Sequence, residues 1–101
     1  MRIKVMADVA STGLWDMDDR RDRMIKYEEL DIPKELELKI DKWIIKYGRM
    51  YRSKKVLTQK LFDSINKTGR EIAKEIKALN NQHSVMYLPF SLNYEEKLEP
   101  V

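Results

Sequence analysis

A cluster of carboxylates directly after Trp15 is the group of side chains in this sequence best suited to chemistry: Asp16, Asp18, Asp19, Asp22, Glu28 and Glu29. Carboxylates at alternate positions can hold a hard cation such as Mg²⁺ or Ca²⁺, and a fixed acidic cluster can instead attract a basic protein surface. Trp15 itself can close one end of a core or anchor an interface, because a large aromatic serves both purposes. The two chemistries make different demands on the neighbouring residues.

The neighbouring residues argue against a metal site. An EF-hand loop that begins at Asp16 needs an acid or amide at its fifth position, glycine at its sixth and glutamate at its twelfth. This chain has Arg20, Arg21 and Tyr27 at those positions. We therefore expect no metal and no cofactor, and we interpret the stretch as a solvated acidic loop that carries arginines as well.

A second charged group is basic and lies further along the chain: Lys39, Lys42, Lys46, Arg49, Arg52, Lys54, Lys55 and Lys60. These cations could contact phosphates, and Tyr47 and Tyr51 could stack on bases, which leaves open a small RNA- or DNA-binding regulator that uses residues 39–60. However, both tyrosines share an apolar stripe with Trp43, which favours a core or half-buried position. Direct nucleic-acid binding is therefore the alternative interpretation.

Nothing in the sequence predicts catalysis. His83 is the only histidine, and no nucleophile motif surrounds it. The three glycines, Gly13, Gly48 and Gly69, are too far apart to form a phosphate-binding loop. We expect a protein that is not an enzyme and has no catalytic residues.

The composition limits the kind of protein further. A chain of 101 residues with 43% hydrophobic and 37% charged residues is typical of one globular domain, residues 1–101. It has no cysteine and no apolar run long enough to cross a bilayer, which predicts a cytoplasmic protein. The net charge of +3 is unevenly spread, with the basic excess in the middle and the acidic excess at both ends.

Periodicity predicts the elements that must position these residues. Alternating apolar residues predict a strand over residues 1–10, followed by a long acidic loop over residues 11–33. Apolar residues at helical spacing predict a helix over residues 34–52, with Asp31 as a candidate N-cap, and a second helix over residues 57–80. Ser53, Lys54 and Lys55 are expected to form the turn between the two helices.

The ends of the second helix and the rest of the chain follow from residue type. Thr58 is expected to cap the helix, and Asn80-Asn81 to end it in a left-handed residue. Gly69 lies on its apolar face, where it would let another backbone approach. Residues 83–90 are expected to form a strand, and Pro89 predicts that this strand either ends there or lies at the edge of the sheet. Residues 93–101 are expected to form a flexible tail.

The order strand, loop, helix, helix, strand predicts a two-layer α+β fold. The two terminal strands would pair in a small sheet, parallel or antiparallel, that packs on an antiparallel helical hairpin.

Several short motifs resemble one group of small bacterial proteins: Lys4-Val5-Met6-Ala7-Asp8, Leu14-Trp15-Asp16, Leu30-x-Ile32-Pro33, Leu36 with Trp43 and Tyr47, and Val85-Met86-Tyr87. The group is the cognate immunity proteins of contact-dependent growth inhibition and polymorphic toxin systems. The chain departs from the pattern at Val9, at Asp19-Arg20-Arg21 and at Lys34.

The resemblance implies a function that the residues alone do not. A protein of this group binds a cognate toxin domain, often a nuclease, and neutralises it. We therefore expect a bacterial immunity protein whose toxin-binding residues are Trp15, Asp16, Asp18, Asp19, Asp22, Glu28 and Glu29. These acids would pair with the positive substrate site of a nuclease, with no membrane and no small-molecule substrate involved.

Overall fold

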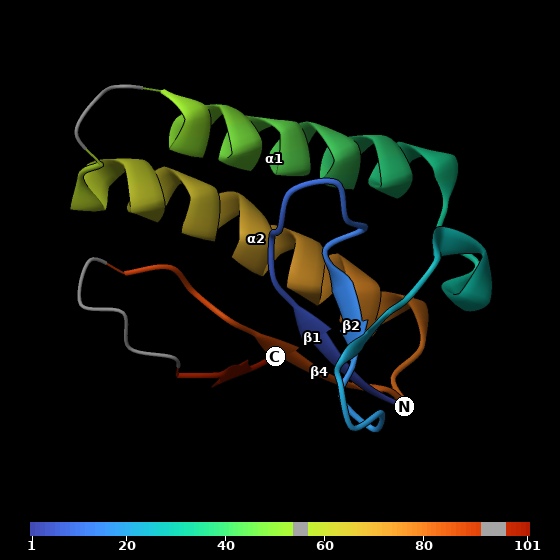
Figure 1. Ribbon diagram of the computed structural model, residues 1–101. Coiled ribbons are helices and arrows are strands. Elements are labelled where there is room, and N and C mark those ends of the chain that lie inside the picture. The colour runs from blue at the N-terminus through green and yellow to red at the C-terminus, as the bar shows by residue number, and fades with distance from the viewer. Residues whose placement is uncertain (54–56, 92–96) are drawn as a thin grey trace.

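The computed structural model describes residues 1–53, 57–91 and 97–101. Within these ranges, two α-helices and five short strands form two layers (Figure 1). Both α-helices lie on the same side of a mixed sheet, and no α-helix of the described residues lies on its other side (Figure 1). The predicted α+β fold, with a small sheet packed on a helical pair, is confirmed.

The sheet has the strand order β3-β2-β1-β4-β5. The bounds of the strands are β1 Arg2–Val5, β2 Leu14–Asp16, β3 Arg23–Met24, β4 Ser84–Tyr87 and β5 Glu99–Pro100. The strands β1 and β4 pair in parallel, and every other neighbouring pair is antiparallel. The predicted pairing of the two terminal strand segments is therefore correct, and their direction is now fixed.

The helices match their predictions closely. The helix α1, Lys34–Arg52, has the predicted bounds, and α2, Gln59–Leu79, begins two residues later than predicted and ends one residue earlier. The Thr58 side chain accepts a hydrogen bond from the Leu61 N–H and caps α2, as expected. In the predicted turn between the helices, Lys54 and Lys55 lie outside the described residues.

The helix ends differ from prediction in three details. The N-cap of α1 is Pro33 and not Asp31. Asp31 instead ends a short 3-10 helix, η1 (Tyr27–Leu30), and has the left-handed conformation. Asn80 at the end of α2 is extended and not left-handed. Gly69 makes room for the Tyr87 ring and not for another backbone.

The predicted acidic loop over residues 11–33 is wrong, because it contains β2, β3 and η1. These elements are two to four residues long, too short to establish a period in the sequence. The first strand ends at Val5 and not at residue 10, because the chain turns at residues 8–11. Ala10 is left-handed there, and the Ser11 hydroxyl donates to the Asp8 carbonyl.

The C-terminal predictions need similar corrections. The strand predicted over residues 83–90 is β4, Ser84–Tyr87, which ends before Pro89 and lies inside the sheet and not at its edge. Of the predicted flexible tail, residues 93–96 lie outside the described residues. Residues 99 and 100 are wrongly predicted, because they form β5 and pair with Met86 and Tyr87.

The core lies between the sheet and the two helices. The side chains of Ile3 and Val5 on β1 are fully buried, and Trp43 of α1 has its indole N–H hydrogen-bonded to the Ile65 carbonyl of α2 at 3.0 Å. The Trp43 and Tyr87 rings lie 6.4 Å apart and join the helix layer to the sheet. The sheet is thereby fixed from one side only.

Candidate functional site

The candidate site is the acidic segment, which we define as residues 14–31. It comprises β2, the turn over residues 17–22, β3 and η1. The Met17 N–H donates to the Arg2 carbonyl at 2.9 Å and holds the segment to β1, and within the segment the Ile25 N–H donates to the Leu14 carbonyl at 2.8 Å. The segment is thus an ordered part of the sheet and not a solvated loop, which corrects the interpretation from sequence.

Trp15 is positioned by the strand register. It lies opposite Lys4 on one side and Met24 on the other, and its indole N–H donates to the Met6 carbonyl at 2.9 Å. The side chain is half-buried on the side of the sheet away from the helices. The structure therefore places Trp15 on a surface, and not at the end of the main core.

The turn between β2 and β3 is built by its own aspartates. The Asp16 carboxylate accepts the Asp18 N–H at 2.9 Å, and the Asp19 carboxylate accepts the Arg21 N–H at 3.1 Å. Asp22 is left-handed with φ 47°, a conformation that aspartate and asparagine tolerate better than most residues. Short side chains that bond to nearby backbone amides favour turns in this way.

Two of the predicted toxin-binding acids form ion pairs with β1. The Arg2 Nε lies 2.8 Å from an Asp18 carboxylate oxygen, and the Lys4 Nζ lies 2.6 Å from an Asp22 carboxylate oxygen. The hydrogen bond from Arg2 lowers the pKa of Asp18 and raises the pKa of Arg2. Each of these two carboxylates thus already has a cation beside it.

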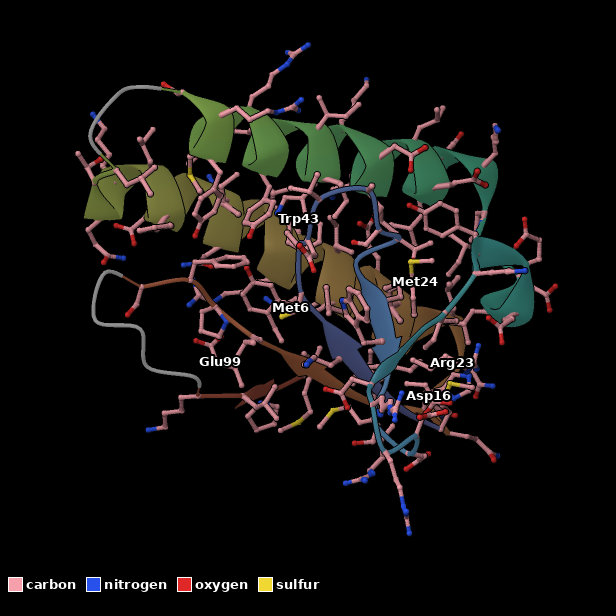
Figure 2. All side chains as sticks on the ribbon, in the orientation of Figure 1. Met6, Asp16, Arg23, Met24, Trp43 and Glu99 are labelled. Atoms are coloured by element: carbon pink, nitrogen blue, oxygen red, sulfur yellow. The ribbon has the colours of Figure 1, made fainter. Side chains whose placement is uncertain are left out.

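Two more predicted acids share Arg23, which lies between them. Its guanidinium is 3.5 Å from an Asp16 oxygen and 2.9 Å from a Glu29 oxygen, and Figure 2 shows Asp16 and Arg23 together at one end of the sheet. Glu29 also accepts the Lys26 N–H at 2.7 Å, and this bond, followed by the contact with Arg23, lowers the pKa of Glu29. The bridge ties β2 to η1.

The remaining two predicted acids carry charges that the domain does not compensate. Among the described residues, Asp19 and Glu28 have no cation within ion-pair distance, and both are exposed. The seven predicted residues thus share one segment, but only four of the six acids have a described cation beside them. The sequence predicted the acids but not Arg2 and Lys4, which lie 16 and 18 positions from their partners and left no local signal.

Those basic residues of the alternative interpretation that the structure describes, which excludes Lys54 and Lys55, do not form one free surface. Lys39 lies 2.9 Å from Glu75 and 3.5 Å from Glu71, and Lys46 donates to the Ser64 hydroxyl. Lys42 and Arg49 are exposed. Cations directed at α2 are less available to phosphates than a continuous patch would be.

The two tyrosines of that interpretation differ in exposure. Tyr47 is half-buried as predicted, and its pKa is raised to about 12, chiefly by burial. Tyr51 is exposed, so its predicted burial is wrong. Tyr51 lies on the last turn of α1, where its ring contacts Tyr47 with 4.8 Å between centroids.

A cavity of about 260 Å³ lies next to the acidic segment, between η1 and the end of α2. Its described lining includes Glu29, Asp31 and His83, and the buried His83 Nδ1 has no hydrogen-bond partner among the described residues. No serine, threonine or lysine lies in that lining. The expectation that the protein has no catalytic residue stays a prediction.

The described residues contain no group of three or more histidines and carboxylates arranged to hold a metal ion. No helix in this part of the chain is both long and apolar enough to span a bilayer.

Comparison with known proteins identifies the family. No curated protein and no solved structure matches the chain. A family model described as Serratia CdiI immunity protein-like matches residues 1–90, which include the whole acidic segment, both helices and β4. The chain therefore belongs to the Serratia CdiI immunity protein-like family.

Proposed function

We propose that this protein binds and neutralises a cognate toxin domain, a nuclease, and that it does so in the bacterial cytoplasm. The toxin-binding residues we propose are Trp15, Asp16, Asp18, Asp19, Asp22, Glu28 and Glu29. The observation that carries the proposal is an ordered acidic segment in a chain of an immunity-protein family. A nuclease has a positive substrate site, to which a fixed acidic surface is complementary.

The seven residues have different roles in this proposal. Asp19 and Glu28 offer exposed carboxylates without an internal cation and meet lysines or arginines of the toxin. Asp16 and Glu29 are positioning residues, because Arg23 joins them and fixes η1 against β2. Asp18 and Asp22 hold the turn to β1, so the acidic segment needs little ordering when the toxin binds.

Inhibition then follows from occlusion. The acidic charges speed the encounter with a basic domain, and the bulk of the immunity protein keeps nucleic acid from the toxin's substrate site. No chemical step is needed on either protein. The immunity protein would act in proportion to the fraction of toxin that it occupies.

The test uses the toxin domain encoded by the neighbouring gene, in a binding assay and in a rescue assay of cells that express the toxin. The variant Asp19→Asn with Glu28→Gln removes two charges and keeps the size of both side chains. We expect an association rate about tenfold lower at low salt and a much smaller difference at 0.5 M salt, because exposed charges act through screened attraction.

The matched control is Glu35→Gln with Asp63→Asn, which removes two exposed charges from α1 and α2. Its net charge equals that of the test variant, so a general charge effect would slow both proteins equally. Equal slowing of the two variants would contradict the role of the acidic segment. Failure of the wild-type chain to bind or rescue would contradict the immunity function itself, and salt-sensitive retention on nucleic acid would then favour the RNA- or DNA-binding alternative.

A further inference from the structure

The side of the sheet without helices carries a continuous row of large side chains. The strand register places Met24, Trp15, Lys4, Met86 and Pro100 opposite one another, one residue from each strand in the order β3-β2-β1-β4-β5. Adjacent residues in such a row have Cβ atoms about 5 Å apart, so their side chains form one surface. We call these five residues the sheet-face row.

The sheet-face row is largely apolar, although its two end residues, Met24 and Pro100, are exposed and the three between them are half-buried. Sheets with one open side usually alternate apolar residues inward with polar residues outward. Here β1 and β4 bury Ile3, Val5, Val85 and Tyr87 toward the helices, yet the outward positions include Met86, and β3 presents Met24 with 39% of its surface exposed. Core packing does not explain these outward methionines and the tryptophan beside them.

The single charge in the row is neutralised within the protein. The Lys4 side chain is only 13% exposed, and its ammonium group lies 2.6 Å from the Asp22 carboxylate. The lysine therefore contributes its aliphatic carbons to the surface between Trp15 and Met86, while its charge is turned toward the acidic segment. Asp22 thus makes the centre of the row electrically neutral.

Met6 extends this surface by one further residue. It follows β1 on the same side as Lys4, its carbonyl receives the Trp15 indole N–H, and the label in Figure 2 places it beside β1. Methionine side chains adapt their shape to a partner, and tryptophan and methionine are both enriched in protein interfaces. The composition of the surface is that of a binding site for an apolar patch on another protein.

Other exposed apolar residues are less well suited to docking. Leu38 and Ile45 are 49% and 50% exposed on the outer side of α1. They stand among charged residues of the same helix: Lys34, Asp41, Lys42, Arg49 and Arg52. A partner on that side would have to desolvate many charges. On the sheet-face row the only charged side chain is Lys4, which is already paired with Asp22.

We infer that the cognate toxin docks over the sheet-face row, with Trp15 and the methionines as the apolar centre and Asp19 at its rim. This inference rests on the proposed function, because membership of an immunity-protein family is what supplies a protein partner. Trp15 and Met24 belong both to the row and to the acidic segment, so the two surfaces are continuous. The complementary surface of the toxin is an apolar patch with lysine or arginine at one side.

The test observes the wild-type chain with its methionine methyl groups labelled with ¹³C for NMR, during titration with a catalytically inactive form of the neighbouring toxin domain. We expect the methyl signals of Met6, Met24 and Met86 to shift or broaden on binding. The internal control is Met50, which lies on α1 against the core and should keep its signal. No substitution is needed, so folding defects do not enter.

A matched pair of variants measures the contribution to affinity. Met24→Glu introduces a charge into the row, and we expect affinity for the toxin to fall at least 30-fold, as for an interface centre. Ile45→Glu introduces the same charge on the outer side of α1 and should change affinity less than threefold.

The outcomes separate the two proposals. Toxin binding that leaves the methyl signals of Met6, Met24 and Met86 unchanged would overturn the docking site but not the immunity function. Shifts of these signals with protein concentration alone, together with a dimer in sedimentation, would show a second copy of the chain on the row and overturn the inference. Absence of any binding by the wild-type chain would overturn both.

Discussion

At the scale of single residues, the contact between Gly69 and Tyr87 joins the helices to the sheet. The Tyr87 ring lies directly on the α2 backbone at Gly69, and its hydroxyl donates to the Asn66 side chain at 2.8 Å. Asn66 also accepts the Phe90 N–H and donates to the Phe90 carbonyl, so every polar atom of this buried group has a partner. Burial raises the pKa of Tyr87, which keeps its hydroxyl proton in the bond.

We predict that Gly69→Ala lowers the free energy of unfolding by about 1–2 kcal/mol, although alanine favours helix. The new Cβ would stand 2.5 Å from the Tyr87 hydroxyl oxygen, and overpacking of a core commonly costs about 1–3 kcal/mol. The control is Gly48→Ala, whose Cβ would meet the guanidinium end of the Arg52 side chain at 3.2 Å and the Val9 side chain at 3.9 Å, with no backbone among its neighbours. It should raise stability by about 0.5–1 kcal/mol, the gain in helix propensity. Urea unfolding measures both, and equal effects of the two substitutions would contradict the contact.

We also predict a double-mutant signature at Lys4 and Asp22. Asp22→Asn should lower the free energy of unfolding by about 1 kcal/mol, because it leaves a largely covered ammonium group without its counter-charge. Adding Lys4→Met removes that charge and should restore stability to within about 0.5 kcal/mol of the wild type. Urea unfolding of the two single variants and the double variant gives the coupling. A purely additive result would show that the ion pair does not stabilise the fold.

At the scale of elements, the sequence predicted the helices well and the strands poorly. The apolar stripe from Leu36 through Trp43 to Tyr51 repeats over about four turns, so its period was unambiguous and both ends of α1 were predicted correctly. The pair β2 and β3 was missed, because strands of three and two residues have no period. They are defined by their partners, β1 for β2 and β2 for β3. Local patterns do not encode such pairing.

The same distinction applies to the candidate site. The acids were identified from residue type, and the left-handed Asp22 fits the turn chemistry expected of aspartate. Their pairing with Arg2 and Lys4 could not be predicted, since it follows from the register of β1 against β2. For the same reason the sheet-face row appears only once five strands are placed side by side.

The strand β5 provides a prediction about pH. It is held to α2 by two hydrogen bonds from the Arg70 guanidinium to Glu99, at 2.8 and 2.9 Å, which lower the pKa of Glu99 below its ordinary value of 4.5. A lowered pKa in the folded state means that the ion pair contributes fully above about pH 5. Its contribution is lost as the pH falls below 4.5 and through the lowered value. The pair is exposed, so we expect the loss to be no more than about 1 kcal/mol.

The ¹⁵N chemical shift of Arg70 Nε measures this loss. It should move toward the value of free arginine between pH 5 and pH 2, in step with protonation of Glu99. In the control variant Glu99→Gln, the ¹⁵N chemical shift of Arg70 Nε should stay constant between pH 5 and pH 2. A wild-type signal that stays constant down to pH 2 would contradict the coupling of β5 to α2.

At the scale of the whole molecule, one core joins both layers. The two tryptophans of the protein lie on opposite sides of the sheet. Trp43 is buried between the helices and the sheet, and Trp15 lies on the helix-free side. Because Ile3 and Val5 of β1 are buried under both helices, neither layer retains its core without the other. The domain should therefore unfold as a unit.

We predict coincident unfolding transitions for the two sides of the sheet. In the variant Trp15→Phe, fluorescence reports on Trp43, and in Trp43→Phe it reports on Trp15. In each variant the fluorescence and far-ultraviolet circular dichroism curves should share one midpoint in urea. We expect the urea midpoint of Trp43→Phe to be lower than that of Trp15→Phe, because Trp43→Phe removes a buried hydrogen bond to Ile65 and leaves a gap. An earlier fluorescence transition in the variant that retains Trp15 would show that the acidic segment opens independently.

The parallel pairing of β1 with β4 also sets an order of events during translation. Ile3 leaves the ribosome before its partner Val85, which follows only after both helices have been made. Until then, the nascent chain can form its two helices locally, while β1 has only β2 beside it and half of its backbone groups remain in water. A newly made molecule gains its complete sheet, and with it any activity that depends on that surface, only after α1, α2, β4 and β5 have all emerged.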